Sequence, residues 1–241
     1  MLIDIHTHIL PGMDDGAAGE AISFQMLKQA YQEGTTLLVA TPHYHCHVGS
    51  DWMEKRQTAY TALCDIAAHI SPELNILLGA EVFYESALTE QLKHGKELTL
   101  NHTCAILVEF SPDVNYLYMK NAFLKLQSMG YVPVLAHIER YAALERIDRV
   151  EELSDMGVKM QVNAGSVIGK HGRKIKRYLL QLMREDLIDL VATDAHNVTD
   201  RPTGMAACVK YLTRKMGAEY CQTVCHDNAW ALLMQDALTK A

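Results

Sequence analysis

The sequence predicts an α/β fold in which parallel strands alternate with helices and close into a barrel. Seven short apolar runs are spread along the 241 residues, and six of them are separated from the next by enough chain for a returning helix. Polar residues of metal-ligating types follow these runs at their carboxyl ends. One barrel of this kind uses about 250 residues. We therefore expect a single domain over residues 1–241.

The predicted strands are short runs rich in aliphatic and β-branched residues. In the first run, residues 3–9, isoleucine alternates with polar residues, so Asp4, His6 and His8 are expected to face the same way. The other six strands are expected at residues 35–41, 75–80, 104–108, 131–136, 158–162 and 187–193.

The segments between these runs have the apolar spacing of helices. In residues 17–34, Ile22, Met26 and Ala30 recur on one face, and Gly34 is expected to end the helix. Further helices are expected at residues 52–69, 115–130, 144–157 and 170–185, and from Pro202 onward, with a helix cap at Asp227 or Asn228.

Composition limits the possible partners and compartments. A formal net charge of −7 disfavours a broad nucleic-acid surface, which needs many lysines and arginines to neutralise phosphates. Polar residues interrupt the N-terminal run, which therefore does not resemble a signal peptide, and no uncharged apolar stretch reaches the roughly 20 residues that span a bilayer. Six cysteines without a paired framework fit a reducing compartment. We expect a cytoplasmic protein without membrane insertion.

The strand ends supply nine potential metal ligands. In a parallel barrel the carboxyl ends of the strands share one mouth. That mouth is expected to collect His6, His8, Asp15, His43, Glu81, Glu109, His137, Asp194 and His196. Taken singly, Glu81 or Glu109 would equally fit a helix N-cap. One ion takes about four to six ligands, so nine donors predict two or three divalent ions. Mn²⁺, Fe and Zn²⁺ are all compatible with these ligand types.

Six motifs follow one another over nearly the whole chain. They are Asp-Ile-His-Thr-His at residues 4–8, Asp-Asp-Gly at 14–16, Gly-Ala-Glu at 79–81, Val-Glu-Phe at 108–110, His-Ile-Glu-Arg-Tyr at 137–141, and Asp-Ala-His-Asn at 194–197 with Arg-Pro at 201–202. In this order they resemble the polymerase and histidinol phosphatase (PHP) superfamily. More closely, they resemble the manganese-dependent protein tyrosine phosphatases of Gram-positive capsule and exopolysaccharide clusters.

The resemblance implies a distorted (βα)7 TIM-like barrel, the PHP fold, with a site for three ions. The ion it implies first is Mn²⁺. It assigns the predicted ligands to three groups. These are His6, His8, Glu81 and Asp194 for one ion, Glu81, Glu109 and His137 for a second, and Asp15, His43 and His196 for a third.

The same resemblance gives Arg140 and Arg201 the role of holding the substrate phosphate. Planar guanidinium groups suit a phosphoryl dianion, although a surface salt bridge is the alternative for each.

The function implied by the resemblance is hydrolysis of phosphotyrosine on a bacterial tyrosine autokinase that controls capsule or exopolysaccharide synthesis. Two alternatives stay open: a small-molecule phosphoesterase acting on histidinol phosphate or nucleotides, and a metal-binding regulator without catalysis.

Three further features need separate interpretations. Cys208 and Arg214 have the Cys-x5-Arg spacing of cysteine-dependent tyrosine phosphatases, but the segment is helix-like and lacks glycines, so we expect Cys208 to be a core residue. His45 and His47 follow His43 in a loop and are expected to be solvated, with contact to substrate and adventitious metal binding as the alternatives. The basic segment 170–177 is expected near the mouth, either steering a phosphopeptide or forming a solvated helix face.

Overall fold

The computed structural model describes residues 1–234, and its strands are all paired in parallel. The strands are β1 (Leu2–Thr7), β2 (Thr35–Ala40), β3 (His43–Tyr44), β4 (Asn75–Leu78), β5 (Glu81–Phe83), β6 (Ala105–Glu109), β7 (Val132–Leu135), β8 (Lys159–Asn163) and β9 (Leu190–Ala192). β3 follows β2 after a two-residue break, and β5 follows β4 in the same way. The nine strands therefore correspond to the seven predicted runs.

Pairing between neighbours closes these strands into a ring. β1 pairs with β2, β2 with β4, and β3 with β5, and the order then runs from β5 through β6, β7 and β8 to β9. A bridge between Thr7 and Ala195 joins the segment after β9 back to β1. The Asp194 amide donates to the His6 carbonyl at 2.8 Å across the same junction. The predicted distorted (βα)7 barrel is confirmed.

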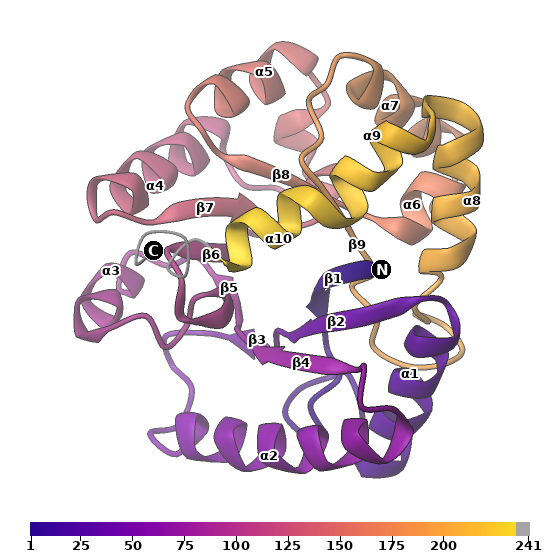
Figure 1. The fold of residues 1–241 in the computed structure, drawn as a ribbon. Coiled ribbons are helices and arrows are strands. Elements are labelled where there is room, and N and C mark those ends of the chain that lie inside the picture. Colours follow the sequence, from indigo (N-terminus) through magenta and orange to yellow (C-terminus); the bar gives the residue numbers. More distant parts are fainter. Residues whose placement is uncertain (235–241) are drawn as a thin grey trace.

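Most helices lie around the outside of the ring, whereas α10 crosses one end of it (Figure 1). The longer ones are α1 (Glu20–Gln32), α2 (Trp52–Ile70), α4 (Tyr116–Ser128), α5 (Ile147–Asp155), α7 (Arg173–Arg184) and α8 (Met205–Met216). The shorter ones are α3 (Leu88–Gln91), α6 (Ala164–Ile168), α9 (Ala218–Gln222) and α10 (Asn228–Leu233). Gly34 follows α1 with φ +92°, a left-handed conformation that favours glycine, so the predicted helix end is confirmed. No described helix is both long and apolar enough to cross a membrane.

The predicted helix cap near Trp230 is wrong. Asp227 has φ −65° and ψ −44°, which is helical, and a π-helical turn (Thr223–Asp227) joins α9 to α10. The Asp227 carboxylate accepts hydrogen bonds from Gln222 and His226 rather than from the first amides of α10. The helix is continuous there, so no cap is needed. The helical prediction for residues 235–241 lies outside the described residues.

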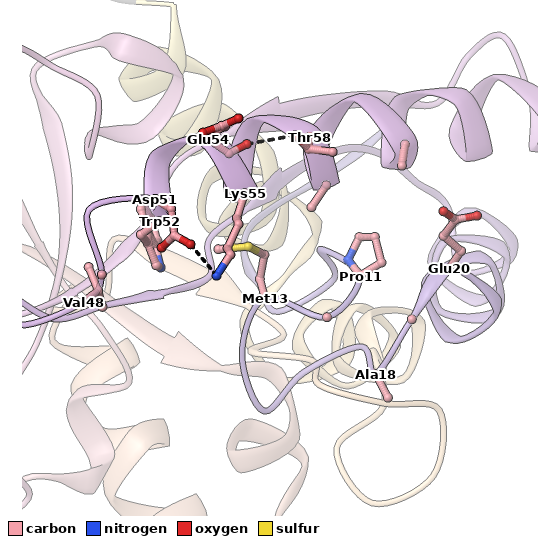
Figure 2. A pocket seen from close by; sticks show the side chains of 15 residues that line it. Pro11, Met13, Ala18, Glu20, Val48, Asp51, Trp52, Glu54, Lys55 and Thr58 are labelled. Carbon is pink, nitrogen blue, oxygen red and sulfur yellow. Dashed lines mark hydrogen bonds and ion pairs between the residues drawn. The ribbon is translucent and has the colours of Figure 1, made fainter.

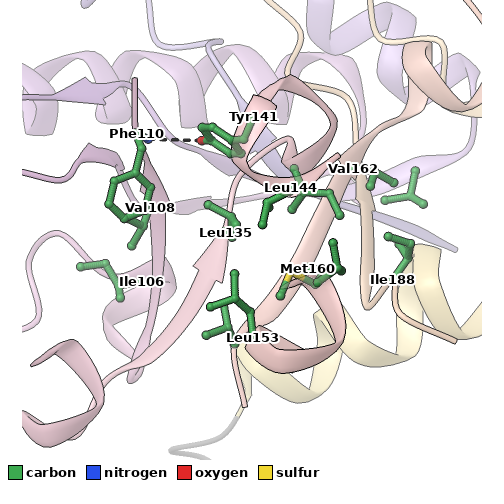
Figure 3. Close-up of a cluster of buried hydrophobic side chains, with 14 of the residues drawn as sticks. Ile106, Val108, Phe110, Leu135, Tyr141, Leu144, Leu153, Met160, Val162 and Ile188 are labelled. Carbon is green, nitrogen blue, oxygen red and sulfur yellow. Dashed lines mark hydrogen bonds between the residues drawn. The ribbon is translucent and has the colours of Figure 1, made fainter. Parts of the chain in front are cut away.

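Aliphatic side chains of β6, β7 and β8 pack against the helices that follow these strands. Figure 3 shows Leu135 and Met160 beside Leu153 of α5, within one large buried cluster. A second cluster lies between β2, β4 and helices α1 and α2, and in a third Leu232 and Leu233 of α10 pack with Ile3 and Ile5 of β1. These contacts hold the strand ends in fixed relative positions.

Candidate metal centre

All nine predicted ligands converge at the carboxyl ends of the strands. At the centre, Nε2 of His6 and Nε2 of His8 are 3.2 Å apart and lie 3.2 and 3.1 Å from Oε2 of Glu81. Oδ1 of Asp194 lies 3.5 Å from the His6 nitrogen and 3.4 Å from the His8 nitrogen. All four side chains are buried. Their donor atoms fall within 4.8 Å of one another, close enough to surround one ion.

The other oxygen of Glu81 faces a second group. Oε1 of Glu81 lies 2.8 Å from Nε2 of His137, which lies 3.3 Å from Oε1 of Glu109. Nδ1 of His43 lies 3.0 Å from Oε2 of Glu81 and 3.6 Å from Oε2 of Glu109. Glu81 therefore stands between two groups of donors, where its two oxygens are placed to serve two ions.

A third group lies at the outer edge. Oδ1 of Asp15 is 3.4 Å from Nε2 of both His43 and His196. The His8 and His196 rings have centroids 3.9 Å apart, and these four residues bring their donor atoms within 4.8 Å. The Asp15 side chain is 64% exposed, so this group opens to solvent.

Hydrogen bonds fix which nitrogen of the two central imidazoles faces the cluster. Nδ1 of His6 contacts Oε1 of Gln161, and this oxygen also accepts from the His137 amide, which fixes it as an acceptor. Nδ1 of His8 contacts a carboxylate oxygen of Asp14 at 2.8 Å. Both rings therefore donate from Nδ1, and their neutral forms direct two lone pairs at each other across 3.2 Å. A cation between the two nitrogens relieves this repulsion.

Several buried polar atoms at the centre lack a hydrogen bond within the described residues. They are Nδ1 of His43, Oε2 of Glu81, Nδ1 of His137 and Nε2 of His196. Oε2 of Glu81 has three imidazole nitrogens within 3.2 Å, yet none directs a hydrogen at it. Donors that are close together without hydrogen-bond geometry are typical of atoms arranged around an ion. The residues fit divalent cations.

The charges of the site also favour a cation. Burial alone would raise the pKa of Glu81, but the positive charge of His6, the hydrogen bond from His137 and the nearby imidazoles of His43 and His6 hold it well below its usual value. Burial would lower the pKa of His8, yet hydrogen bonds to Asp14, Asp194 and Glu81 raise it well above its usual value. The buried carboxylates therefore draw positive charge onto the imidazoles, a role that metal ions take more effectively.

Unusual backbone geometry aims two of these side chains. His137 follows β7 with φ +34° and Asp194 follows β9 with φ +54°, both in the left-handed region that non-glycine residues rarely adopt. Each such conformation costs about 1–3 kcal/mol and concentrates at functional sites. The strained turns direct both side chains into the mouth, where His137 meets Glu81 and Asp194 meets His6.

Four polar residues around the cluster were not among the predicted ligands. Asp14 accepts from His8 and from the His43 amide, and the charge and hydrogen bonds of His8 help lower its pKa to about 2 although burial opposes this. Gln161 positions His6, and Asn163 donates to Asp194 at 2.7 Å. Asp4 accepts from the amide and hydroxyl of Thr193 instead of joining the imidazoles. For Gln161 and Asn163, the sequence did contain a signal. They are polar residues at alternate positions of a predicted strand, and this spacing places both inside the ring.

Both predicted arginines line a cleft of about 500 Å³ beside the cluster. Arg140 and Arg201 form ion pairs with Asp194, and their side chains are 34% and 38% exposed. Lys170 and His171, from the predicted basic segment, line the same cleft. Lys174 instead pairs with Glu145 at 2.8 Å, so only the start of that segment reaches the mouth. Four basic side chains make this cleft suitable for an anion.

A second cavity, of about 1080 Å³ and larger than the cleft beside the cluster, lies away from these donors (Figure 2). It is bounded by the loop that carries Pro11 and Met13 and by the first turns of α2, where Asp51 pairs with Lys55. None of the nine predicted ligands lines it. Size alone therefore does not mark the chemical centre of this molecule.

The cysteine alternative finds no support in the surroundings of Cys208. Its side chain is fully buried in α8, and burial raises the pKa of its thiol. A protonated thiol without solvent access is a poor nucleophile. Cys208 is a core residue, as the sequence indicated.

A parallel barrel whose mouth gathers imidazoles, carboxylates and two exposed arginines belongs to the class of metal-dependent phosphoesterases. The family profile described as capsular polysaccharide synthesis, CpsB/CapC, matches residues 2–234. The chain belongs to this CpsB/CapC family, which confirms the resemblance drawn from the motifs.

Curated relatives agree with this assignment. Tyrosine-protein phosphatase CpsB of Streptococcus pneumoniae is 31% identical, over 98% of this chain and 100% of its own length. Tyrosine-protein phosphatase YwqE of Bacillus subtilis strain 168 is 34% identical, over 90% of this chain and 86% of its own. The putative tyrosine-protein phosphatase CapC of Staphylococcus aureus is 33% identical, over 83% of this chain and 79% of its own.

Solved structures give the same result for the fold. A structure from work on YwqE and CpsB, described as unique metal-dependent tyrosine phosphatases, superimposes with a TM-score of 0.89 at 34% identity and covers 96% of this chain and 94% of its own. The organophosphorus hydrolase of Deinococcus radiodurans superimposes with a TM-score of 0.63 at 14% identity over 96% and 92% of the two chains. The second likeness concerns the barrel alone.

Proposed function

We propose that this protein is a metal-dependent protein tyrosine phosphatase. Its ions, Mn²⁺ in the first place, are held by the nine converging residues. The observation that carries the proposal is the pair of imidazole nitrogens, on His6 and His8, that face each other with both Nδ1 atoms already engaged. Such a pair needs a positive charge between its two nitrogens, which a metal ion or a proton supplies, and the neighbouring carboxylates of Glu81 and Asp194 favour the metal ion. The donor set combines four carboxylates with five imidazoles and contains no thiolate, which favours Mn²⁺ over softer ions.

The proposed grouping of ligands is the one that the family resemblance implies, and the distances between the donor atoms support it. His6, His8, Glu81 and Asp194 hold one ion, Glu81, Glu109 and His137 a second, and Asp15, His43 and His196 a third. When bound, such ions lower the pKa of coordinated water and polarise phosphoryl oxygens. The carboxylate of Glu81, with oxygens facing two groups, fixes the spacing between them.

Arg140 and Arg201 are proposed to hold the phosphate. Each guanidinium uses one nitrogen on Asp194 at close range and keeps about a third of its side chain accessible. Their remaining N–H groups can donate to two phosphoryl oxygens, and their charge offsets the charge of the transition state. Phenolate leaves readily because the pKa of tyrosine is about 10, so the reaction makes a modest demand on a general acid.

A protein substrate fits the openness of the mouth. Asp15, Arg140 and Arg201 are all partly exposed, and the cleft beside them extends to Lys170 and His171. An accessible cleft with basic walls suits a phosphotyrosine on an acidic peptide. The family's link to capsular polysaccharide synthesis supports a bacterial tyrosine kinase of that system as the substrate. The alternative is a small phosphomonoester such as histidinol phosphate.

The deciding experiment compares turnover of a phosphotyrosine peptide with turnover of histidinol phosphate, on protein whose metal content has been measured. We expect the peptide to be the better substrate by kcat/KM. A preference for histidinol phosphate would favour the small-molecule phosphoesterase. A fully metal-loaded protein that hydrolyses no aryl phosphate would instead be a metal-binding regulator.

A second experiment separates metal-dependent from cysteine-dependent catalysis. Activity should survive iodoacetamide and be lost with a strong chelator, whereas the opposite result would favour a cysteine nucleophile.

We further propose that the whole chain, residues 1–241, acts as one phosphatase domain in the cytoplasm. The six cysteines are unpaired, which fits a reducing compartment. Fractionation of cells followed by immunodetection tests the location.

A further inference from the structure

A second group of metal-ligating side chains lies on the rim of the barrel, outside the nine residues of the centre. His45, His47 and Glu85 bring a donor atom each within 4.8 Å of the others. None of the three belongs to the clusters described above. From this arrangement we propose a separate binding site for a borderline transition-metal ion, Zn²⁺ in the first place, on the loops that follow β3 and β5.

The register of the two strands builds this group. β3 and β5 pair in parallel, with His43 opposite Glu81 and Tyr44 opposite Val82. Continued beyond the strands, the same register sets residue 45 beside residue 83 and residue 47 beside residue 85. The His45 ring does lie against Phe83, with centroids 5.0 Å apart. The two loops therefore leave the barrel side by side and carry their ligands together.

The Glu85 carboxylate is held in place and is not paired with a basic side chain of the described residues. Oε2 of Glu85 accepts a hydrogen bond from the Cys46 amide at 3.1 Å, which ties it to the loop that carries both histidines. Among residues 1–234, no lysine or arginine forms an ion pair with Glu85. The His45 and His47 rings lie 5.2 Å apart and form no side-chain hydrogen bonds in the described part of the chain. Their ring nitrogens are free to coordinate.

The donor chemistry of the rim group suits zinc. Two imidazoles and one carboxylate are a common ligand set for Zn²⁺, which binds such sites more tightly than Mn²⁺ does. Tetrahedral zinc with bonds of about 2.0–2.1 Å places its donors about 3.4 Å apart. The donor atoms here lie within 4.8 Å, so rotation of partly exposed side chains has to shorten their distances by at most about 1.4 Å. Three protein ligands leave the fourth position for water. A bound ion would join the two loops beside His43, whose ring centroid is 6.4 Å from that of His45.

The test uses full-length protein loaded with Mn²⁺ and kept in excess Mn²⁺. Zn²⁺ is titrated against a chromophoric chelator, while free Mn²⁺ is followed by its electron paramagnetic resonance signal. We expect about one Zn²⁺ per chain to bind without release of protein-bound Mn²⁺. His47→Ala and Glu85→Gln should weaken this step at least tenfold, because each removes one of three ligands or its charge. The Glu85→Gln side chain keeps an acceptor for the Cys46 amide.

Two matched controls sharpen the result. His69→Ala removes an exposed histidine on α2. Cys46→Ser replaces the thiol that contacts Glu85 with a hydroxyl that can donate to the same carboxylate, and it keeps the amide that holds Glu85. Both should bind Zn²⁺ as the unaltered protein does. Zinc uptake that always releases an equal amount of Mn²⁺, or that persists at full affinity in His47→Ala and Glu85→Gln, would overturn the proposal. Loss of binding in Cys46→Ser would overturn the assigned ligand set.

Discussion

At the scale of single residues, the centre depends on side chains that do not themselves face the ions. Gln161 is the clearest case, because its one amide oxygen contacts Nδ1 of His6 and accepts from the His137 amide. Its NH₂ group donates to Asn163, which in turn donates to Asp194. One buried chain of hydrogen bonds thus orients three proposed ligands.

The first prediction concerns this residue. Gln161→Met keeps the volume but removes the acceptor, so the tautomer and orientation of His6 are no longer fixed. Loss of such partners lowers metal affinity or activity by about 10–100-fold. Metal titration of the variant measures the effect. Gln161→Glu, which keeps an acceptor for His6, should lose less affinity, and equal losses in the two variants would contradict the positioning role.

The second prediction concerns Arg140. Arg140→Ala should reduce kcat for an aryl phosphate by about 10²-fold or more, because a donor to the charge of the transition state is lost. Metal content measured by elemental analysis should not fall, since Arg140 contacts Asp194 only through a guanidinium nitrogen. Arg146→Ala removes an exposed arginine that pairs with Asp148 and serves as the control. Unchanged turnover in Arg140→Ala would remove this residue from the mechanism.

At the scale of elements, loops between strands and helices bring ligands together. The loop from Pro11 to Gly19 folds back onto the end of β1, where the Ala17 amide donates to the His8 carbonyl at 2.9 Å. A side chain at Gly16 would meet that carbonyl, because an added Cβ would lie 2.1 Å from the oxygen. The absence of a side chain there lets Asp14 and Asp15 reach the centre.

The third prediction follows from this close approach. Gly16→Ala should push the loop outward, weaken binding at the Asp15, His43 and His196 group, and lower the measured metal content and turnover. Gly19→Ala is the matched control, because an added Cβ there meets no atom within 4 Å and its φ of 173° is ordinary extended backbone. Equal metal content in the two variants would contradict the proposed role of the loop.

The fourth prediction separates stability from function. Asn115 caps α4, its side chain accepting from the amides of Leu117 at 2.9 Å and Tyr118 at 3.4 Å. Asn115→Ala should lower the free energy of unfolding by about 1 kcal/mol, measured by urea denaturation, with metal content unchanged. Asn115→Asp, which keeps a capping acceptor, should retain most of the stability. Full stability in the alanine variant would show that the cap contributes nothing.

At the scale of the whole molecule, the centre joins strands from both ends of the chain. The bridge from β1 to the segment after β9 and the contact between His6 and Asp194 link residues almost 190 positions apart. Glu81, Glu109 and His137 add strands from the middle of the sequence. Ions bound here would therefore stabilise the ring as a whole.

The fifth prediction tests this coupling. Ions that bind only the folded state stabilise it by about 2.7 kcal/mol per site at a free concentration about 100-fold above Kd. For a domain of this size that corresponds to about 5–10 °C in Tm. Removing the metal with a chelator should lower Tm by at least this amount in a calorimetric scan, and adding Mn²⁺ should restore it. An unchanged Tm after addition of the chelator would argue against ions at the centre.

The sequence by itself determined the order of strands and helices and the identity of the converging donors. Runs such as residues 35–41 and 158–162 were recognisable because strand and helix periodicities are local properties of the chain. The nine donors followed from their positions after such runs, since parallel strands place their carboxyl ends together. The cap expected near Asp227 failed because a π-helical turn carries the helix through that point.

Only the tertiary structure decided how these residues meet. The register between β3 and β5 put His47 near Glu85, and ring closure brought Gln161 to His6. The left-handed turns at His137 and Asp194 set the direction of two ligands. Register and ring closure join residues distant in sequence, and their free energy comes from packing over the whole barrel. No local pattern in the chain encodes them.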